Sequence, residues 1–402
     1  MWSKLLAVLA LITATSAAVY YIWFDSTPSP FVTQASSTSP PLRVGNRVYL
    51  LTTQSKLTPD FGDSPSNILK DMERFLDLWA FDTDNVKPLY RQRLRTISGG
   101  NVLGYSFLGA HNQTLWLLLA SELHAINRES GVVSGNAEKI GSLNPTLRSL
   151  IPTEQRYFEV NPEGLTIQAA DARTWYLHPD TLIASKTPPV IESKGVPTPY
   201  VDPQSMDAFY KRGVNIGKRW LGLLTPKESV DLNGMSSRYS QTLGAPTRRS
   251  LYAADITNER IGNFKPITED FLAPGLLAEH RPTGGGAVIL RRNPDSVFIL
   301  HRDRLGQDGK LFLARVASPE GKILWNTALN LSILQTIMPD DQSLLLFGRR
   351  YPTKAPNVDQ SGDPYQAAHE ILIALDWATG TLKSFDFSDI EHHPAATLNP
   401  LP

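Results

Sequence analysis

The most regular pattern in this chain is a short apolar run that ends at a polar residue and resumes after a turn. Its clearest instance is Ile371 to Lys383, with the sequence ILIALDWATGTLK. The Asp376 side chain can bond to its own backbone at the start of a turn, and Gly380 supplies a positive φ without steric cost. The pattern predicts a β-hairpin, and its aligned landmarks are Asp82, Asn127, Pro179, Asp255, Pro319 and Asp376.

Apolar runs of this kind dominate the body of the chain. They are rich in Leu, β-branched and aromatic residues, and turn residues separate them at short intervals, which is typical of strands rather than helices. The predicted strands include 44–53, 75–82, 115–120, 165–170, 174–177, 251–255, 297–301, 311–316, 344–347 and 371–375. We therefore expect an all-β, β-propeller-like fold of six to eight divergent four-stranded blades.

Two of the turn phrases resemble the repeat of quinoprotein-like (PQQ-type) β-propellers. They are Ala374 to Gly380 (ALDWATG) and Ser318 to Trp325 (SPEGKILW). That repeat places a strand, an Asp, a Thr-Gly turn and a second strand that often ends in Trp. The chain also resembles a group of membrane-anchored bacterial proteins that have no assigned activity. The resemblance implies a fold and says little about function.

The amino terminus is predicted to be a membrane anchor. The segment from Leu5 to Phe24 is twenty residues long and has no charge, and a helix of that length spans the hydrocarbon core of about 30 Å. It ends in the aromatic cluster 20–24, which suits a membrane interface. Lys4 before the segment and Asp25 after it favour a cytoplasmic amino terminus and a body that faces the periplasm. The alternative is a signal peptide cleaved near 16–18, which would release the body into the periplasm.

The chain divides by composition into four parts. Residues 1–25 are the anchor or signal segment, and 26–41 form a linker rich in Ser, Thr and Pro. The propeller-like domain is expected over 42–390, with an insertion at about 187–250 that does not match the repeat and could start a short helix at 202–210. Residues 391–402 are a tail.

Composition excludes several kinds of site. There is no cysteine, so a disulfide framework, a thiolate metal site and a cysteine nucleophile are excluded. The 39 basic and 39 acidic residues balance, so no overall field recruits nucleic acid. A quinone-dependent alcohol dehydrogenase is expected to carry an adjacent cysteine pair and a Glu/Asn/Asp calcium set, and neither can be placed here. We therefore predict no cofactor.

Residues with possible chemistry have simpler structural interpretations. The glycines 284–286 precede an apolar strand instead of the helix that a phosphate loop needs. The segment 359–363 (DQSGD) has two carboxylates but lacks the other positions of a calcium loop. No Gly-x-Ser-x-Gly motif is present. The histidines show no metal-ligand spacing; they are His111, His124, His178, His280, His301, His369, His392 and His393.

Two further groups are assigned to packing or to the surface. Arginine pairs at 248–249, 291–292 and 349–350 flank strands, where they are solvated or meet an anionic partner such as a glycan or lipid headgroups. Large indole rings near turns are expected to fill the seams between sheets, with each N–H bonded to a backbone oxygen; they are Trp79, Trp175, Trp220, Trp325 and Trp377.

These observations predict a non-catalytic recognition or scaffold module of the cell envelope. It is held in the inner membrane by its amino-terminal helix and binds a protein or glycan at one rim. The catalytic and cofactor-binding residues are unknown at this stage, and no metal site is expected. The alternative is an envelope enzyme, an oxidoreductase or a lyase/hydrolase, that uses the central channel of the propeller.

Overall fold

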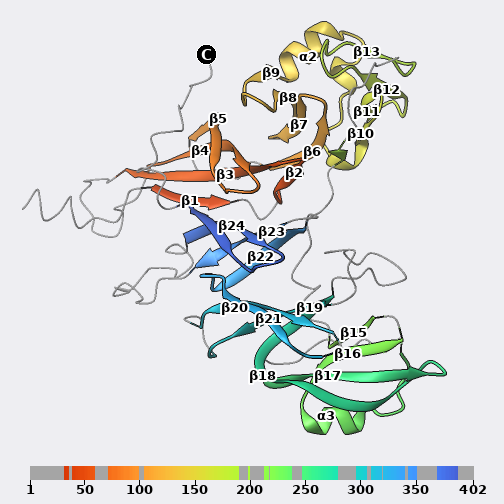
Figure 1. The fold of residues 1–402 in the computed structure, drawn as a ribbon. Coiled ribbons are helices and arrows are strands. Elements are labelled where there is room, and N and C mark those ends of the chain that lie inside the picture. The colour runs from red at the N-terminus through yellow and green to blue at the C-terminus, as the bar shows by residue number, and fades with distance from the viewer. Residues whose placement is uncertain are drawn as a thin grey trace, which may run out of the picture.

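The structure, a computed structural model, describes residues 31–35, 39–58, 71–98, 104–189, 198–199, 212–216, 218–237, 247–278, 296–305, 309–318, 320–339, 343–350 and 369–387. These residues are built almost entirely from antiparallel strands, which form five sheets (Figure 1). The helices described are short: α2 (Ala137–Leu143), η2 (Arg148–Leu150), η3 (Gln155–Tyr157) and α3 (Pro226–Asp231).

The first three sheets follow one another along the chain. Sheet A contains β1 (Phe31–Ala35), β2 (Leu42–Val44), β3 (Arg47–Thr58), β4 (Asp71–Asp82) and β5 (Pro88–Ser98). Sheet B contains β6 (Tyr105–His111), β7 (Thr114–Leu119), β8 (Glu122–Asn127) and β9 (Val133–Gly135), with β14 (Thr198–Pro199) paired to β6. Sheet C contains β10 (Phe158–Asn161), β11 (Gly164–Gln168), β12 (Thr174–Leu177) and β13 (Ala184–Ser185).

The last two sheets form the C-terminal half. Sheet E contains β15 (Gly213–Ile216), β16 (Arg219–Leu224), β17 (Thr247–Thr257), β18 (Arg260–Ala278), β19 (Ser296–Arg302), β20 (Leu311–Ala317) and β21 (Ile323–Ala328). Sheet D contains β22 (Ile333–Pro339), β23 (Ser343–Arg350), β24 (His369–Asp376) and β25 (Leu382–Asp386).

Sheet E is continuous because one long strand belongs to two groups. Residues Arg260 to Ala273 of β18 pair with β17. Residues Leu272 to Ala278 of the same strand pair with β19. A register shift between Leu272 and Gly275 marks the change of partner. The strands β15 to β18 and β18 to β21 are therefore two antiparallel groups of four that share β18.

The sheets pack face to face in the spatial order C, B, A, D, E. Separate clusters of buried apolar residues join B with C, A with B, A with D, and D with the β19–β21 part of sheet E. In Figure 1 the blue strands of sheet D accordingly lie between the red strands of sheet A and the cyan strands of sheet E. The C-terminal sheet thus packs on the N-terminal one, although the two are far apart in the sequence.

This packing explains why the strands are apolar throughout rather than at alternate positions. In β7, Leu115 and Leu117 contribute to the core between sheets A and B, whereas Trp116 and Leu118 contribute to the core between B and C. Both faces of the strand are therefore buried. The same holds for β24, where Ile373 faces sheet E and Leu372 faces sheet A.

The expected all-β fold is confirmed, and its groups of four antiparallel strands are consistent with a propeller-like arrangement. The predicted strands lie in the five sheets, and the segment 187–250, which did not match the repeat, supplies β14, β15, β16, α3 and the start of β17. The predicted anchor 5–24 and the predicted short helix 202–210 lie outside the described residues. Within the described ranges, no helix has both the length and the hydropathy required to cross a membrane.

Candidate functional site: the turns that dock one sheet onto the next

One six-residue turn recurs five times, always between the last two strands of an antiparallel group. The first residue donates its N–H to the carbonyl of the sixth, and its own carbonyl accepts from the N–H of the fifth. We call these the docking turns. They begin at Asp82 in sheet A, Asn127 in sheet B, His178 in sheet C, Ala317 in sheet E and Asp376 in sheet D.

The fifth residue of every docking turn has a positive φ. Three of these residues are glycines, whereas Val86 and Leu182 adopt the left-handed conformation as buried apolar residues. Because that conformation is strained for a branched side chain, tertiary packing must hold both in place. The five φ values are 53° at Val86, 76° at Gly131, 59° at Leu182, 70° at Gly321 and 70° at Gly380.

A polar side chain at the first position closes four of the turns. The Asp376 carboxylate accepts from the N–H of Thr379 at 2.7 Å, and the Asn127 amide oxygen accepts from the N–H of Ser130 at 3.0 Å. Asp82 accepts from the N–H of Asn85 at 2.9 Å, and His178 accepts through Nδ1 from the N–H of Asp180 at 3.1 Å. The acidic or amide residue in the sequence pattern is therefore a turn cap, as predicted.

Three of the aligned landmarks do not occupy the predicted place. His178 and Ala317 begin the turns in sheets C and E, so Pro179 and Pro319 follow the first position instead of occupying it. Asp255 lies within β17, paired with Gly262, and the chain reverses at Asn258 and Glu259. The alignment failed because the backbone pattern accepts His or Ala at its first position, which sequence similarity does not reveal.

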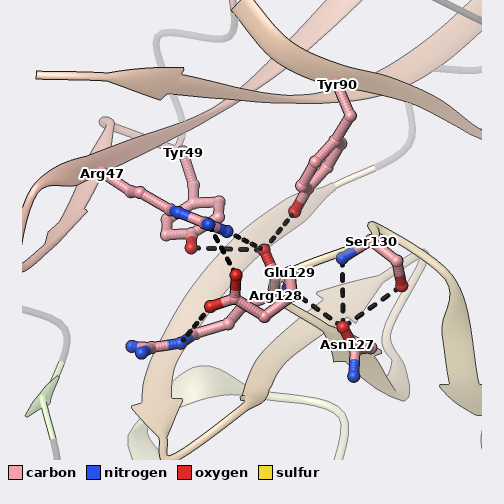
Figure 2. Close-up of polar contacts among 7 residues, drawn as sticks. All are labelled: Arg47, Tyr49, Tyr90, Asn127, Arg128, Glu129 and Ser130. Carbon is pink, nitrogen blue, oxygen red and sulfur yellow. Dashed lines mark hydrogen bonds and ion pairs between the residues drawn. The ribbon is translucent and has the colours of Figure 1, made fainter.

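The docking turn of sheet B contacts sheet A through the carbonyl oxygen of Arg128. Three donors of sheet A converge on this oxygen: Arg47 Nη1 at 3.3 Å, the Tyr49 hydroxyl at 3.3 Å and the Tyr90 hydroxyl at 3.0 Å. Figure 2 shows these donors pointing at the turn, which Asn127 closes from inside. Sheet A thus forms hydrogen bonds to a backbone atom of sheet B, and the position of this atom depends on the conformation of the turn.

Charged groups surround this contact. Arg47 forms an ion pair with Glu129 at 2.5 Å, and Arg128 Nε lies 3.6 Å from the same carboxylate (Figure 2). Burial raises the pKa of the Tyr49 and Tyr90 hydroxyls above the ordinary value of 10.0, and the nearby arginines offset only part of this effect. Both hydroxyls therefore remain protonated donors up to strongly alkaline pH.

Three of the other docking turns also offer a backbone carbonyl to a neighbouring sheet. In sheet D, the Trp377 carbonyl accepts from Trp325 Nε1 and Arg315 Nη1 of sheet E, both at 2.9 Å. In sheet C, the Pro179 carbonyl accepts from the Thr114 hydroxyl of sheet B at 3.3 Å. In sheet A, Lys383 of sheet D donates to the Asp84 carbonyl at 3.2 Å.

Glycine at the fifth position allows the closest approach. A Cβ atom at Gly321 would lie 1.9 Å from the carbonyl oxygen of Ile267, and one at Gly380 would lie 2.6 Å from the ring of Trp325. A Cβ at Gly131 would lie 2.6 Å from the ring of Tyr90. In each case the neighbour belongs to the preceding group of strands, so these glycines are required by contact as well as by φ.

The histidines that the structure describes are engaged in local structure. His111 is fully buried, with Nε2 3.2 Å from the Pro162 carbonyl, and His178 caps its turn. His124 bonds to the Glu122 carbonyl, and His301 bonds to Asn326 at 2.9 Å; burial lowers the pKa of both imidazoles. His369 lies 3.7 Å from Asp386. The remaining histidines, 280, 392 and 393, lie outside the described residues.

In the part of the chain that the structure describes, no three His, Asp or Glu side chains are placed to hold a metal ion. The glycines 284–286 and the segment 359–363 both lie outside that part.

Arginines of the predicted basic pairs take part in ion pairs within the sheets. Arg249 pairs with Glu228 at 3.2 Å, Arg349 with Glu370 at 3.1 Å and Arg350 with Asp386 at 2.5 Å. The pair 291–292 lies outside the described residues. The three arginines are thus bound to carboxylates of the same chain.

Sequence reasoning missed the buried ion pair of sheet A. Asp77 is fully buried and accepts from Arg91 at 2.6 Å and from Arg93 at 3.1 Å. The available signal was an aspartate inside the apolar run 75–81 together with arginines at alternate positions of the next strand. Such a pair is costly to break, because it would leave a buried charge without a partner.

The tryptophans do lie in the seams between sheets, but their N–H groups differ. Trp325 bonds to a backbone oxygen as predicted, whereas Trp79 Nε1 bonds to the Thr52 hydroxyl at 2.9 Å. The N–H of Trp175 is buried without a hydrogen-bond partner. Trp220 packs in the cluster that covers α3, and Trp377 packs between sheets D and E.

Comparison with known proteins adds no family assignment. No protein-family model matches the sequence, and no curated protein matches it. Solved structures with some likeness include a GH43 β-xylosidase/α-arabinofuranosidase from a compost microbial metagenome, with 9% identity, a TM-score of 0.21 and coverage of 90% of this chain and 92% of that one.

Two carotenoid-related structures show a similar likeness. An apocarotenoid oxygenase from Synechocystis has 10% identity and a TM-score of 0.22, with coverage of 89% of this chain and 66% of that one. An ACO/RPE65 chimera has 11% identity and a TM-score of 0.24, with coverage of 88% and 60%. At these TM-scores the likeness carries no argument about fold or activity.

Proposed function

We propose that the chain is a six-bladed propeller that acts as a non-catalytic recognition or scaffold module of the cell envelope. The blade count follows from the strands: sheets C and D have four strands each, sheets A and B have four with one further strand each (β2 and β14), and sheet E supplies two groups of four that share β18. Apolar clusters pack sheet A on B and B on C, and they set the last sheet of the chain, D, against the first, A, which supports this arrangement. Among the described residues no apolar cluster joins sheet C to the first half of sheet E.

The observation that carries the proposal is that the recurring polar residues cap the docking turns. Asp82, Asn127, His178 and Asp376 all cap docking turns, and the carbonyls of these turns accept hydrogen bonds from the preceding sheet. The repeated residues of the sequence therefore lock blades together. A rigid disc of this kind presents many loops on a fixed frame, which suits recognition of a large partner.

The quinoprotein-like repeat and the membrane anchor are parts of the same proposal. The turn from Asp376 to Gly380 and its contact with Trp325 support a packing role for the repeat that does not involve a quinone. The uncharged segment 5–24 would hold the disc at the periplasmic side of the inner membrane, where the partner is an envelope protein or glycan.

Affinity capture tests this function. The full chain is crosslinked in membranes, purified, and analysed for bound proteins and glycans, while the same preparation is assayed for metal, quinone and turnover. A partner recovered in stoichiometric amount, and lost from a variant with altered rim loops, is the expected result. A stoichiometric cofactor with turnover would instead establish an envelope enzyme.

A further inference from the structure

We propose that the arginine pair Arg212 and Arg249, on the first half of sheet E, binds one oxyanion. The ligand class is a group with two or more acidic oxygens, namely a phosphate, a sulfate or a carboxylate. The inference stands on the local geometry and does not depend on the proposed recognition function.

Two arginines share a single carboxylate at this place. Glu228 lies in α3 and pairs with Arg212 Nη2 at 2.9 Å and with Arg249 Nε at 3.2 Å. One carboxylate thus faces two guanidinium groups, which leaves one positive charge in excess. In sheet A, Asp77 also faces two arginines, Arg91 and Arg93, but neither of them has a buried nitrogen without a hydrogen bond.

Glu228 can accept nothing more. Its Oε1 accepts from Arg212 Nη2 and from Arg249 Nη2, and its Oε2 accepts from Arg249 Nε and from the Thr225 N–H at 2.9 Å. Four donors occupy the lone-pair sites of a carboxylate. The hydrogen bond from Arg249 and the charges of both arginines lower the Glu228 pKa, although burial alone would raise it, so the group remains ionised at neutral pH.

Each of the two arginines has one guanidinium nitrogen that lacks an acceptor. Arg249 Nη1 and Arg212 Nε are both buried and make no hydrogen bond. Only 5% of the Arg249 side chain is exposed, compared with 16% for Arg212 and 20% for Glu228. Buried guanidinium donors without an acceptor cost free energy, so an acceptor with negative charge would be bound with a net gain.

The two guanidinium groups lie side by side, since both bond to Oε1 of Glu228. Planar guanidinium forks present paired N–H groups that match the oxygens of carboxylates and phosphates. The partly exposed Arg212 and Glu228 mark the side from which the ligand approaches. No covalent chemistry is implied, because the group would be held only by charge and hydrogen bonds.

The thermal unfolding midpoint of the full chain tests the site. Sodium phosphate, sulfate and acetate are titrated separately against sodium chloride at constant ionic strength, so that general screening is the same in each series. We expect the midpoint to rise with the logarithm of the anion concentration above the dissociation constant, by about 2 °C at tenfold excess. A rise with phosphate or sulfate alone assigns a tetrahedral ligand, and a rise with acetate alone assigns a carboxylate.

Two variants and a matched control make the result specific. Arg212→Gln should abolish the rise in the midpoint that the anion causes beyond the chloride series, and Glu228→Gln should enlarge it, because two arginines would then lack their shared carboxylate. Arg349→Gln removes an arginine with a similarly buried ion pair in sheet D and should leave the response unchanged. The arginine Nε–H resonance assigned through Arg212→Gln should shift with the anion in the wild type.

The proposal is overturned if none of the three anions raises the midpoint of the wild-type protein beyond the chloride series. It is equally overturned if Arg212→Gln responds as the wild type does, since the anion would then bind elsewhere. If Glu228→Gln does not fold, the comparison of Arg212→Gln with Arg349→Gln still decides between these outcomes.

Discussion

The last turn of sheet B and the last turn of the first group in sheet E connect equivalent strands in different ways. Sheet B uses a docking turn, whose Arg128 carbonyl accepts three hydrogen bonds from sheet A. The β17–β18 turn is a tight hairpin at Asn258 and Glu259, where both residues have positive φ and are exposed. In sheets A, B, C and D the longer turn accepts hydrogen bonds from a neighbouring sheet and thereby holds the two sheets together.

The largest loss of stability is expected at Gly321, the docking-turn glycine whose added Cβ would lie closest to a neighbouring atom. Gly321→Ala places a Cβ against the Ile267 backbone at positive φ, so the turn must move away from β18. We expect a loss of about 3 kcal/mol in the free energy of unfolding, measured by urea denaturation. Gly45→Ala is the control, because Gly45 also has positive φ but its Cβ would meet nothing within 4 Å; it should cost about 1 kcal/mol. Equal losses in the two variants would show that contact with the neighbour is unimportant.

A smaller effect is expected from removing one donor to a turn carbonyl. Trp325→Phe deletes the N–H that bonds to the Trp377 carbonyl, and it also shortens the ring against Gly380. We expect a loss of about 2 kcal/mol in the free energy of unfolding. Trp175→Phe is the matched control, since it removes a buried indole whose N–H has no partner, and its cost should be about 1 kcal/mol lower. The idea fails if the control is the more damaging substitution.

The contact in Figure 2 should tolerate the loss of one hydroxyl. Tyr90→Phe leaves Tyr49 and Arg47 bonded to the Arg128 carbonyl, so the expected loss is about 1 kcal/mol at neutral pH. A pH series adds a second readout. Because the folded-state pKa of Tyr90 is raised above 10.0, its contribution is fully present below pH 10 and is lost as pH rises further. Above that pH, wild-type stability should fall more steeply than that of Tyr90→Phe, by about 1.4 kcal/mol per pH unit. Identical slopes would contradict the burial of this hydroxyl.

The smallest effect is expected in the undocked hairpin. Glu259→Gly relieves a non-glycine residue at a φ of 61° and completes an Asn-Gly pair, which suits a tight two-residue turn. We expect a gain of about 0.5 kcal/mol in the free energy of unfolding. In contrast, Gly131→Ala in the docking turn of sheet B should destabilise the protein, because its Cβ would meet the Tyr90 ring. The Glu259 carbonyl accepts a hydrogen bond from the Ser237 N–H at 2.7 Å, so a destabilised Glu259→Gly variant would indicate that this bond depends on the non-glycine backbone.

Sequence patterns predicted the strands well, because a strand between two sheets must be apolar on both faces. Runs such as 115–119 and 371–375 therefore stood out without any alternation. The turn caps Asp82, Asn127 and Asp376 could be predicted for a local reason, since side chain and backbone partner are only a few residues apart. His178 and Ala317 could not, because the same turn forms there through backbone hydrogen bonds that any residue can make.

The candidate site was beyond sequence reasoning for the opposite reason. The donors to the Arg128 carbonyl come from Arg47, Tyr49 and Tyr90, between 38 and 81 positions away, and no local pattern relates them. The same is true of Arg212, Glu228 and Arg249, which reach one another only when α3 packs beside β16 and β17. Their charges could be counted in the sequence, but the excess of two arginines over one carboxylate depends on folding.

The sequence by itself determined an all-β chain with recurring capped turns, because strand burial and turn closure depend on residues close together in the chain. Tertiary structure alone decided that those turns hold the preceding sheet, that the C-terminal sheet packs on the N-terminal one, and which arginines keep a donor without an acceptor. These features depend on hydrogen bonds and apolar contacts between distant segments, whose free energy appears only when the sheets are packed together.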